Sequence, residues 1–219
     1  LSYWLLGFYD VLALRYIGRT VSYARAAFTS FIAYAFGHNL GVASFTGAAV
    51  RYRLYASSGL SAADVAAVAV FCSVTTSIGL AVLAGLAFVV APAAGAAALH
   101  LSAPLVLLLG CLLLGGVIAY AAWSLLRAEP VELQGWSLRA PLPGVALPQI
   151  VLAIVDLGLS AAVLWVLLPA SAAVSLPLFT GIYAVAITAG VVSHVPGGLG
   201  VFESVMVLAL PGIAPDQLV

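Results

Sequence analysis

Three long apolar stretches constrain the fold of this chain more than any other feature of its sequence. They cover residues 65–90, 103–126 and 146–168, and Asp156 is the one charged side chain within them. A helix needs roughly 20 predominantly apolar residues to cross a hydrocarbon core of about 30 Å. Each stretch therefore predicts a membrane-spanning helix, and residues 3–17 predict the end of a further span.

Charge is scarce in the whole chain of 219 residues, of which 6% are charged and 65% are hydrophobic. Water-soluble domains carry about 25% charged residues, so the composition excludes that class. The formal net charge is zero, and no basic run suggests a nucleic-acid partner. Cys72 and Cys111 lie in separate apolar stretches, which predicts two small core residues rather than a disulfide or a metal site.

Two further apolar regions, residues 25–56 and 177–210, are each interrupted by glycine near the middle. The breaks read HNLGVA and HVPGGLG. Each half is about 10 to 17 residues long, which at about 1.5 Å per residue is short for a full crossing. The sequence therefore predicts two re-entrant hairpins that meet near mid-membrane. A kinked full span at each break is the alternative, although PGGLG holds many helix breakers for a simple kink.

The arginines predict the orientation, because Arg and Lys accumulate in short cytoplasmic loops. This rule places residues 18–24, 57–62 and 127–144 in the cytoplasm, and residues 91–102 and 169–176 outside. Three spans then separate the hairpins, which makes them inverted copies, an arrangement that points to a midplane binding site in transport proteins. The expected fold is an all-α, polytopic integral membrane helix bundle with two inverted re-entrant hairpins.

Charged side chains at membrane depth usually face a cavity or a partner, because exposing them to lipid is costly. Five residues qualify: Asp10, Arg51, Arg53, Asp156 and Glu203. Asp10 has no well-placed partner on its own helix and needs one on another helix. Arg51 and Arg53 lie on nearly opposite helix faces, and Arg51 is the deeper. Arg51 either forms a buried ion pair with Asp10 or Asp156, or binds a phosphate through two hydrogen bonds.

The break PGGLG leads directly into a helix that begins near Val201. Free backbone N–H groups around Gly197, Gly198 and Gly200, together with the helix dipole, predict an anion site there. Glu203 falls near the third position of this helix, where it either caps the same amides or binds a cationic group.

His194 and His38 stand at the two glycine-rich breaks, and His194 is therefore included among the substrate-binding candidates. A hydrogen-bonded structural role is the expectation for both histidines. The chain shows no Cys/His/Asp spacing that suits a metal and no glycine loop after a strand, so neither a metal nor a cofactor is expected.

Three runs together resemble a known family: YDVLALRYIG (residues 9–18), FTGAAVRYRLY (residues 45–55) and SHVPGGLGVFES (residues 193–204). They are similar, in order, to the membrane region of bacterial lysylphosphatidylglycerol synthetase/flippase proteins, the multiple peptide resistance factor (MprF) family. Members of this family join a flippase domain to a cytosolic domain that transfers lysine or alanine from aminoacyl-tRNA to phosphatidylglycerol. The resemblance covers the flippase region alone and predicts that the chain is a fragment of it, without the transferase.

The resemblance implies a multi-pass protein of the bacterial inner membrane that moves aminoacylated phosphatidylglycerol from the inner to the outer leaflet. This transport would lower the negative surface charge and confer resistance to cationic antimicrobial peptides. Arg51 and the glycine amides would bind the lipid phosphate, and the acidic candidates would bind the ammonium groups. Two alternatives stay open: a membrane scaffold that docks lipid for a cytosolic lysyltransferase, and a secondary transporter of a small anion. Homo-oligomer formation also stays open.

Overall fold

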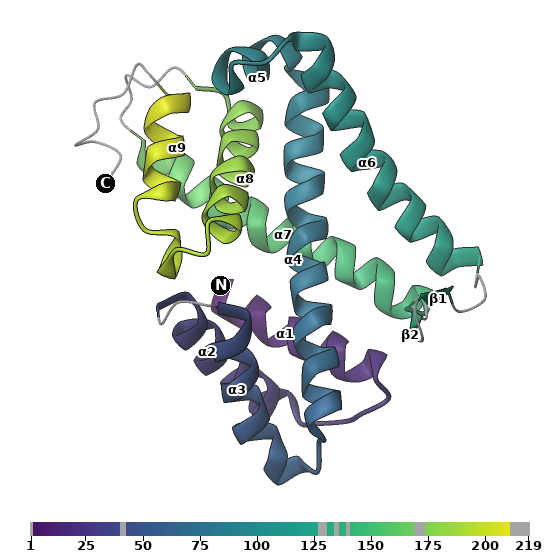
Figure 1. Ribbon diagram of the computed structural model, residues 1–219. Coiled ribbons are helices and arrows are strands. Elements are labelled where there is room, and N and C mark those ends of the chain that lie inside the picture. The colour runs from purple at the N-terminus through teal and green to yellow at the C-terminus, as the bar shows by residue number, and fades with distance from the viewer. Residues whose placement is uncertain are drawn as a thin grey trace.

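The computed structural model describes residues 2–39, 43–126, 131–133, 136–138, 141–168 and 174–210, and it is helical apart from one pair of short strands (Figure 1). Its elements follow in the order α1 (Ser2–Tyr16), α2 (Tyr23–Asn39), α3 (Ala43–Tyr55), η1 (Ala56–Ser58), α4 (Ala62–Val90), α5 (Pro92–Leu99), α6 (Ala103–Leu126), β1 (Val131–Leu133), β2 (Trp136–Leu138), α7 (Pro143–Leu167), α8 (Leu176–Val192), η2 (Pro196–Gly198) and α9 (Val201–Ala209). The all-α prediction is confirmed.

Helices α4, α6 and α7 are long and apolar enough to cross a membrane, and they coincide with the three predicted spans within a few residues. Their ends have local causes. Ser61 and Asp64 form a capping box that begins α4, with the Ser61 hydroxyl accepting from the Asp64 N–H at 3.1 Å. Pro92 follows the last residue of α4 by two positions, where proline lacks the N–H that would continue the helix.

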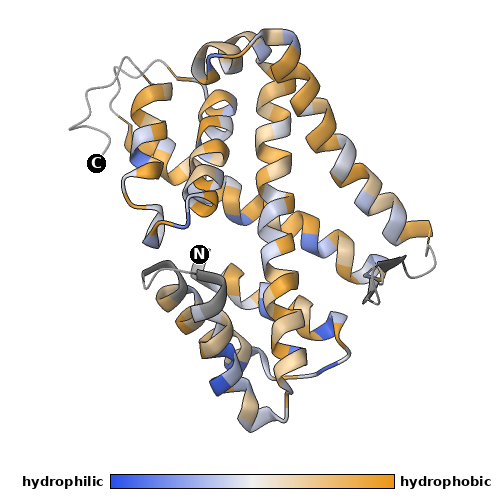
Figure 2. Ribbon diagram, in the orientation of Figure 1, coloured by the Kyte–Doolittle hydropathy of each residue, from blue (hydrophilic) through white to orange (hydrophobic). Residues whose placement is uncertain are grey.

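Helix α4 is the central element of the bundle. Within its most apolar window 44% of the residues are buried, against 22% for α7 and 11% for α6. Helix α4 contacts α1, α3, α5, α6, α7 and α8. Helix α6 packs mainly along the C-terminal half of α4 (Figure 1). The outer faces of α6 therefore remain available to lipid, and most of its ribbon has the colour of hydrophobic residues in Figure 2.

Small residues let the helices approach α4 closely. A Cβ on Gly79 of α4 would stand 2.8 Å from the Ala153 carbonyl oxygen of α7, and a Cβ on Gly181 of α8 would overlap the Ala87 Cβ. Membrane helices associate through such van der Waals packing because lipid tails provide no hydrophobic drive between them. The two glycines thus fix how α7 and α8 lie against α4.

Two helical hairpins flank α4, α2–α3 along its first half and α8–α9 along its second half, with their tips turned toward each other (Figure 1). The tip of the second hairpin, η2, contacts α2. Each hairpin has its own apolar core: one cluster is centred on Tyr9, Leu14, Tyr55 and Val68, and another on Phe88, Val106, Phe179 and Ile182. Both cores include residues of α4.

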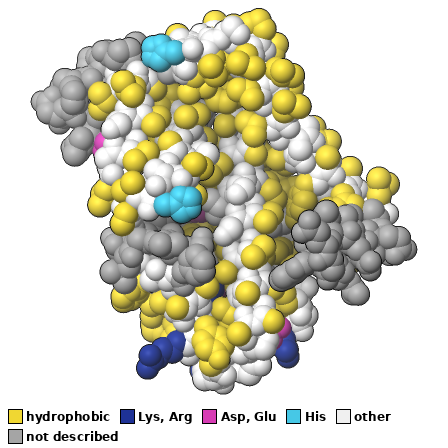
Figure 3. All heavy atoms as spheres, viewed as in Figure 1, with side chains coloured by type: hydrophobic (Ala, Val, Ile, Leu, Met, Phe, Trp, Pro, Cys, Tyr) yellow, Lys and Arg dark blue, Asp and Glu magenta, His cyan; other side chains and the backbone are white. Residues whose placement is uncertain are grey.

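The exposed arginines, as distinct from the buried Arg51, gather at the end of the bundle where α3 finishes and α4 begins. Arg19 forms a 3.0 Å ion pair with Asp64, and Arg25 donates to the Ser58 hydroxyl at 2.8 Å. Figure 3 shows basic side chains at this end and hydrophobic side chains scattered over the rest of the visible face, and the ribbon in Figure 2 has its strongest hydrophilic colour at the same end.

Three details differ from the prediction or fall outside the description. The predicted outer loop, residues 91–102, contains the short helix α5. Cys111 is exposed on α6, so its prediction as a core residue is wrong, whereas Cys72 is buried as expected. The centre of the first glycine break, residues 40–42, lies outside the described residues.

Candidate substrate-binding site

Asp10 of α1 and Arg51 of α3 form a buried ion pair. The guanidinium directs Nη2 to Asp10 Oδ1 at 2.9 Å and Nε to Oδ2 at 3.1 Å, a two-pronged contact. The side chain of Asp10 is fully buried, and Arg51 is 5% exposed. Of the two alternatives for Arg51, the structure contains the ion pair, and it supplies the partner on another helix that Asp10 requires.

Two more side chains complete the surroundings of Asp10. The Tyr55 hydroxyl donates to Asp10 Oδ2 at 2.7 Å, and the Cys72 thiol of α4 lies 3.5 Å from Oδ1. Tyr55 follows Arg51 by four residues, which places both on one face of α3. Asp10 thereby accepts hydrogen bonds from side chains of α3 and α4. These donors offset the cost of burying the Asp10 carboxylate away from water.

A chain of tyrosines leads from this ion pair to a second carboxylate. The Arg51 guanidinium lies over the Tyr34 ring at 5.2 Å, and Tyr34 meets Tyr9 edge-on with 6.3 Å between ring centroids. The Tyr9 hydroxyl donates to Asp156 Oδ2 of α7 at 3.2 Å. We call the seven residues of this network the buried polar cluster: Tyr9, Asp10, Tyr34, Arg51, Tyr55, Cys72 and Asp156.

The buried polar cluster joins α1, α2, α3, α4 and α7 near the middle of the bundle. It contains one guanidinium and two carboxylates, of which Asp156 is 6% exposed. Placing such groups in a low-dielectric interior requires hydrogen bonds and countercharges, and ionisable groups within membrane proteins usually mark a ligand or ion pathway. The cluster therefore contains both a cationic and an anionic group, which are paired with each other.

The second glycine break forms a compact tip. Gly197, Gly198 and Gly200 all have positive φ angles, which glycine adopts without strain. Gly198 packs on Gly190 so tightly that a Cβ on Gly198 would stand 3.1 Å from the Gly190 Cα. The turn therefore requires glycine at positions with positive φ, and the close approach of Gly198 to Gly190 leaves no room for a side chain.

The amides of this tip already have acceptors within the chain. The Gly200 N–H donates to Glu203 Oε2 at 2.7 Å, and the Gly198 N–H donates to the Val195 carbonyl at 2.9 Å. Of the two roles considered for Glu203, the structure contains the helix cap. An anion at the start of α9 would have to use the remaining first-turn amides or displace the Glu203 carboxylate.

The structure separates the other candidates from the cluster. Arg53 is exposed near the end of α3 that carries the basic side chains. His194 is exposed at the tip, where its Nδ1 lies 2.7 Å from the Val192 carbonyl oxygen. Within the described part of the chain, no hydrogen bond or ion pair joins Glu203 or His194 to Asp10, Arg51 or Asp156. The side chain of His38 lies outside the description.

Four members of the buried polar cluster, Tyr9, Tyr34, Tyr55 and Cys72, are absent from the sequence-based candidates. From the sequence, the tyrosines of this aromatic-rich chain are interpreted as residues of the membrane interface or of helix packing. Spacing could have identified two of them, because Tyr55 stands four residues after Arg51 and Tyr9 is adjacent to Asp10. Among the residues that the structure describes, no group of three or more His, Cys, Asp or Glu side chains is placed to hold a metal ion.

The apolar spans, the shared central helix and the buried charged cluster define a helical membrane protein. In sequence the chain is similar to the Inner membrane protein YbhN of Escherichia coli, with 31% identity over 218 residues, and to the Uncharacterized protein slr0712 of Synechocystis sp., with 37% identity over 210 residues. Each match covers 96% of this chain, and the chain spans 66% and 65% of the two relatives. No protein-family model matches.

Proposed function

We propose that this chain is the transmembrane part of a lipid flippase that moves aminoacylated phosphatidylglycerol from the inner to the outer leaflet of the bacterial inner membrane. The transferase chemistry of the MprF family would belong to a cytosolic domain outside these residues. The sequence runs that resemble that family include Asp10, Arg51 and Glu203. Transport of such a lipid would make the cell surface less attractive to cationic antimicrobial peptides.

The observation that carries the proposal is the buried polar cluster, to which the hairpin α2–α3 contributes Tyr34, Arg51 and Tyr55, while the tip η2 of the second hairpin contacts α2. The hairpins would be re-entrant, one from each side of the membrane, and would open the cluster to one leaflet at a time. The arginines at the α3–α4 end favour a cytoplasmic location for that end. The contact between η2 and α2 would then close one side of the path.

The headgroup of an aminoacylated phosphatidylglycerol matches the Asp10–Arg51 ion pair in charge. Separating a buried ion pair is strongly unfavourable when either partner is left alone. A headgroup that carries both a phosphate and ammonium groups can replace both partners at once, with phosphate on Arg51 and ammonium on Asp10. Asp156 would hold a second ammonium group, and the tyrosines would offer ring faces to the cation.

A leaflet-exposure assay tests this function. The full-length protein is reconstituted in vesicles with fluorescent lysylphosphatidylglycerol, and the fraction accessible to a membrane-impermeant quencher is followed in time. We expect Arg51→Lys and Asp156→Asn to lower the rate at least tenfold, about 1.4 kcal/mol or more in the barrier. The matched control Arg25→Gln removes a charge at the basic end of the bundle and should keep the native rate.

The same vesicles distinguish the alternatives. Native transport rates in both cluster variants would refute the assigned site. A native protein that fails to expose labelled lipid but lets phosphate or another small anion through would favour the anion transporter. Failure of both, with retained binding of lipid by a following cytosolic transferase domain, would favour the docking scaffold.

A further inference from the structure

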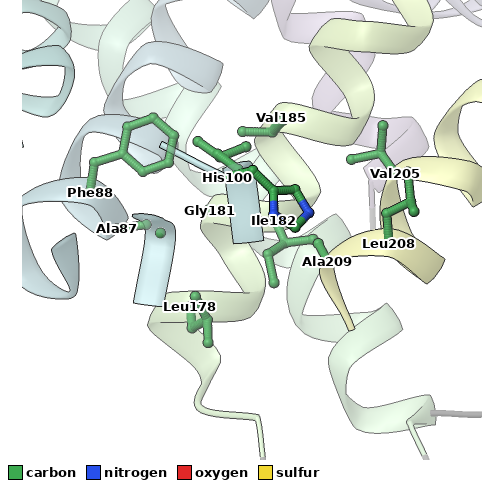
Figure 4. Close-up of a pocket in the computed structure, with 12 residues that line it drawn as sticks. Ala87, Phe88, His100, Leu178, Gly181, Ile182, Val185, Val205, Leu208 and Ala209 are labelled. Carbon is green, nitrogen blue, oxygen red and sulfur yellow. The ribbon is translucent and has the colours of Figure 1, made fainter. Parts of the chain in front are cut away.

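A pocket lies at the opposite end of the bundle from the basic side chains. It is a pocket of about 210 Å³ enclosed by the last turn of α4, the short helix α5, and the helices α8 and α9 (Figure 4). Phe88, Ile182 and Val205 form walls, and Gly181 lets α8 approach α4 behind them. This pocket shares no residue with the buried polar cluster.

The lining is apolar with one exception. Every side chain that lines the pocket is hydrocarbon or glycine except His100, whose imidazole projects among them in Figure 4. A water molecule needs two to four polar partners to be stable in a cavity, and one ring cannot supply them. The pocket therefore suits a hydrocarbon ligand rather than water or a soluble polar molecule.

His100 ends the helix α5 and contributes its ring to the pocket lining. His100 caps the C-terminus of α5 with a φ of +54°, the left-handed conformation that helices usually reserve for glycine or asparagine. Its ring nitrogens are the polar atoms that the lining side chains offer to a ligand.

The surroundings identify the occupant. The chain is solvated by lipid, and Leu208 at the rim is 69% exposed, so the pocket opens toward that lipid. Its volume of about 210 Å³ is far above the roughly 15 Å³ that one water molecule needs by the same measure, and it suits a segment of one hydrocarbon chain rather than a whole lipid. We propose that this pocket binds a segment of one phospholipid acyl chain, with His100 hydrogen-bonded to an ester or phosphate oxygen of the same lipid.

This site goes beyond the proposed function, because it requires a bilayer and not a transport cycle. The test uses phosphatidylglycerol with a diazirine in one acyl chain, mixed into phosphatidylethanolamine vesicles that contain the full-length protein. After irradiation, mass spectrometry of peptides locates the adducts. We expect adducts on α8 and α9 lining residues well above those on the lipid-facing residues Leu112 and Ile118 of α6.

Two variants sharpen the result. Ala209→Phe fills the pocket and should abolish the enrichment, whereas Ile118→Phe adds the same ring on the outer face of α6 and should not. His100→Gly suits the left-handed backbone and removes the imidazole, so the enrichment should fall about fivefold, the effect of one hydrogen bond. All three variant proteins are first checked for a native elution volume in detergent.

Three outcomes would overturn the proposal. Adducts spread over the pocket and α6 in proportion to exposure would exclude a specific site. Enrichment that survives Ala209→Phe would place the chain elsewhere. Lining residues that stay free of adducts while Leu112 and Ile118 are labelled would show that the acyl chain does not enter the pocket. Each outcome leaves the leaflet-exposure assay unaffected, so the two proposals fail separately.

Discussion

The hydroxyl of Tyr9 donates a hydrogen bond to the Asp156 carboxylate at 3.2 Å, and this contact connects α1 with α7. Tyr9 is adjacent to Asp10, so one turn of α1 carries one carboxylate of the buried polar cluster, Asp10, and contacts the other, Asp156. The ion pair and the second acid are thus linked through a single short piece of helix.

Replacing Tyr9 by phenylalanine removes that hydrogen bond and keeps the ring. We expect Tyr9→Phe to lower the free energy of unfolding by about 0.5–1.5 kcal/mol, measured by thermal denaturation in detergent. Tyr16→Phe, on the same helix and outside the cluster, serves as the comparison. A loss of lipid transport much larger than this stability change would show that the contact serves the transport cycle, and an unchanged transport rate would show that it serves the fold alone.

The Asp10–Arg51 pair should behave as a coupled unit. Asp10→Asn or Arg51→Gln alone leaves a buried charge without its countercharge and should destabilise the protein by about 3–5 kcal/mol. The double variant, with two neutral amides, should recover much of that loss in a double-mutant cycle. It should also remain inactive in lipid transport, and additive effects on stability would contradict the pairing.

Close packing at Gly181 should make α8 intolerant of even one methyl group. Gly181→Ala places a Cβ against the Ala87 Cβ, so we expect a loss of about 1–3 kcal/mol. The matched control is Gly115→Ala on α6, where an added Cβ meets no atom within 4 Å and helix propensity favours alanine by about 1 kcal/mol. Chemical denaturation that ranks the two variants in the reverse order would refute the described contact between α8 and α4.

Substitutions at Glu203 can distinguish the effect of its charge from the effect of its hydrogen bond with the Gly200 N–H. Glu203→Gln keeps an oxygen that can accept from the Gly200 N–H, so its stability should lie within about 0.5 kcal/mol of native, whereas Glu203→Ala should lose about 0.5–2 kcal/mol. Limited proteolysis at the hairpin tip and thermal denaturation report both effects. If Glu203→Gln transports lipid at the native rate, capping is the whole role of the residue.

The large-scale fold followed from the sequence because its signals are local and strong. Long apolar runs predicted α4, α6 and α7, and the glycines of the second break predicted the hairpin tip. The short helix α5 was missed because its eight residues, mostly alanine, lie between two spans and read as a loop. Cys111 was misplaced because an apolar run does not indicate which of its faces meets lipid and which meets protein.

The candidate site was predictable in its charges and not in its contacts. Asp10, Arg51 and Asp156 were identified because a charge at membrane depth requires a partner, and the Asp10–Arg51 pairing was one of the alternatives considered. The choice among partners depends on helix rotation, which a sequence of uniform hydrophobicity does not reveal. The tyrosines and Cys72 were missed for the same reason, since their chemistry appears only when five helices bring them together.

The two apolar cores described above are joined by the helices α4 and α7, which contribute residues to both. Folding cooperativity should therefore divide at the hairpins, because a disturbance in one core reaches the other mainly through these two helices. Amide protons of α2 and α3 would then exchange with solvent independently of those of α8 and α9. A molecule divided in this way can loosen one half while the other half stays ordered.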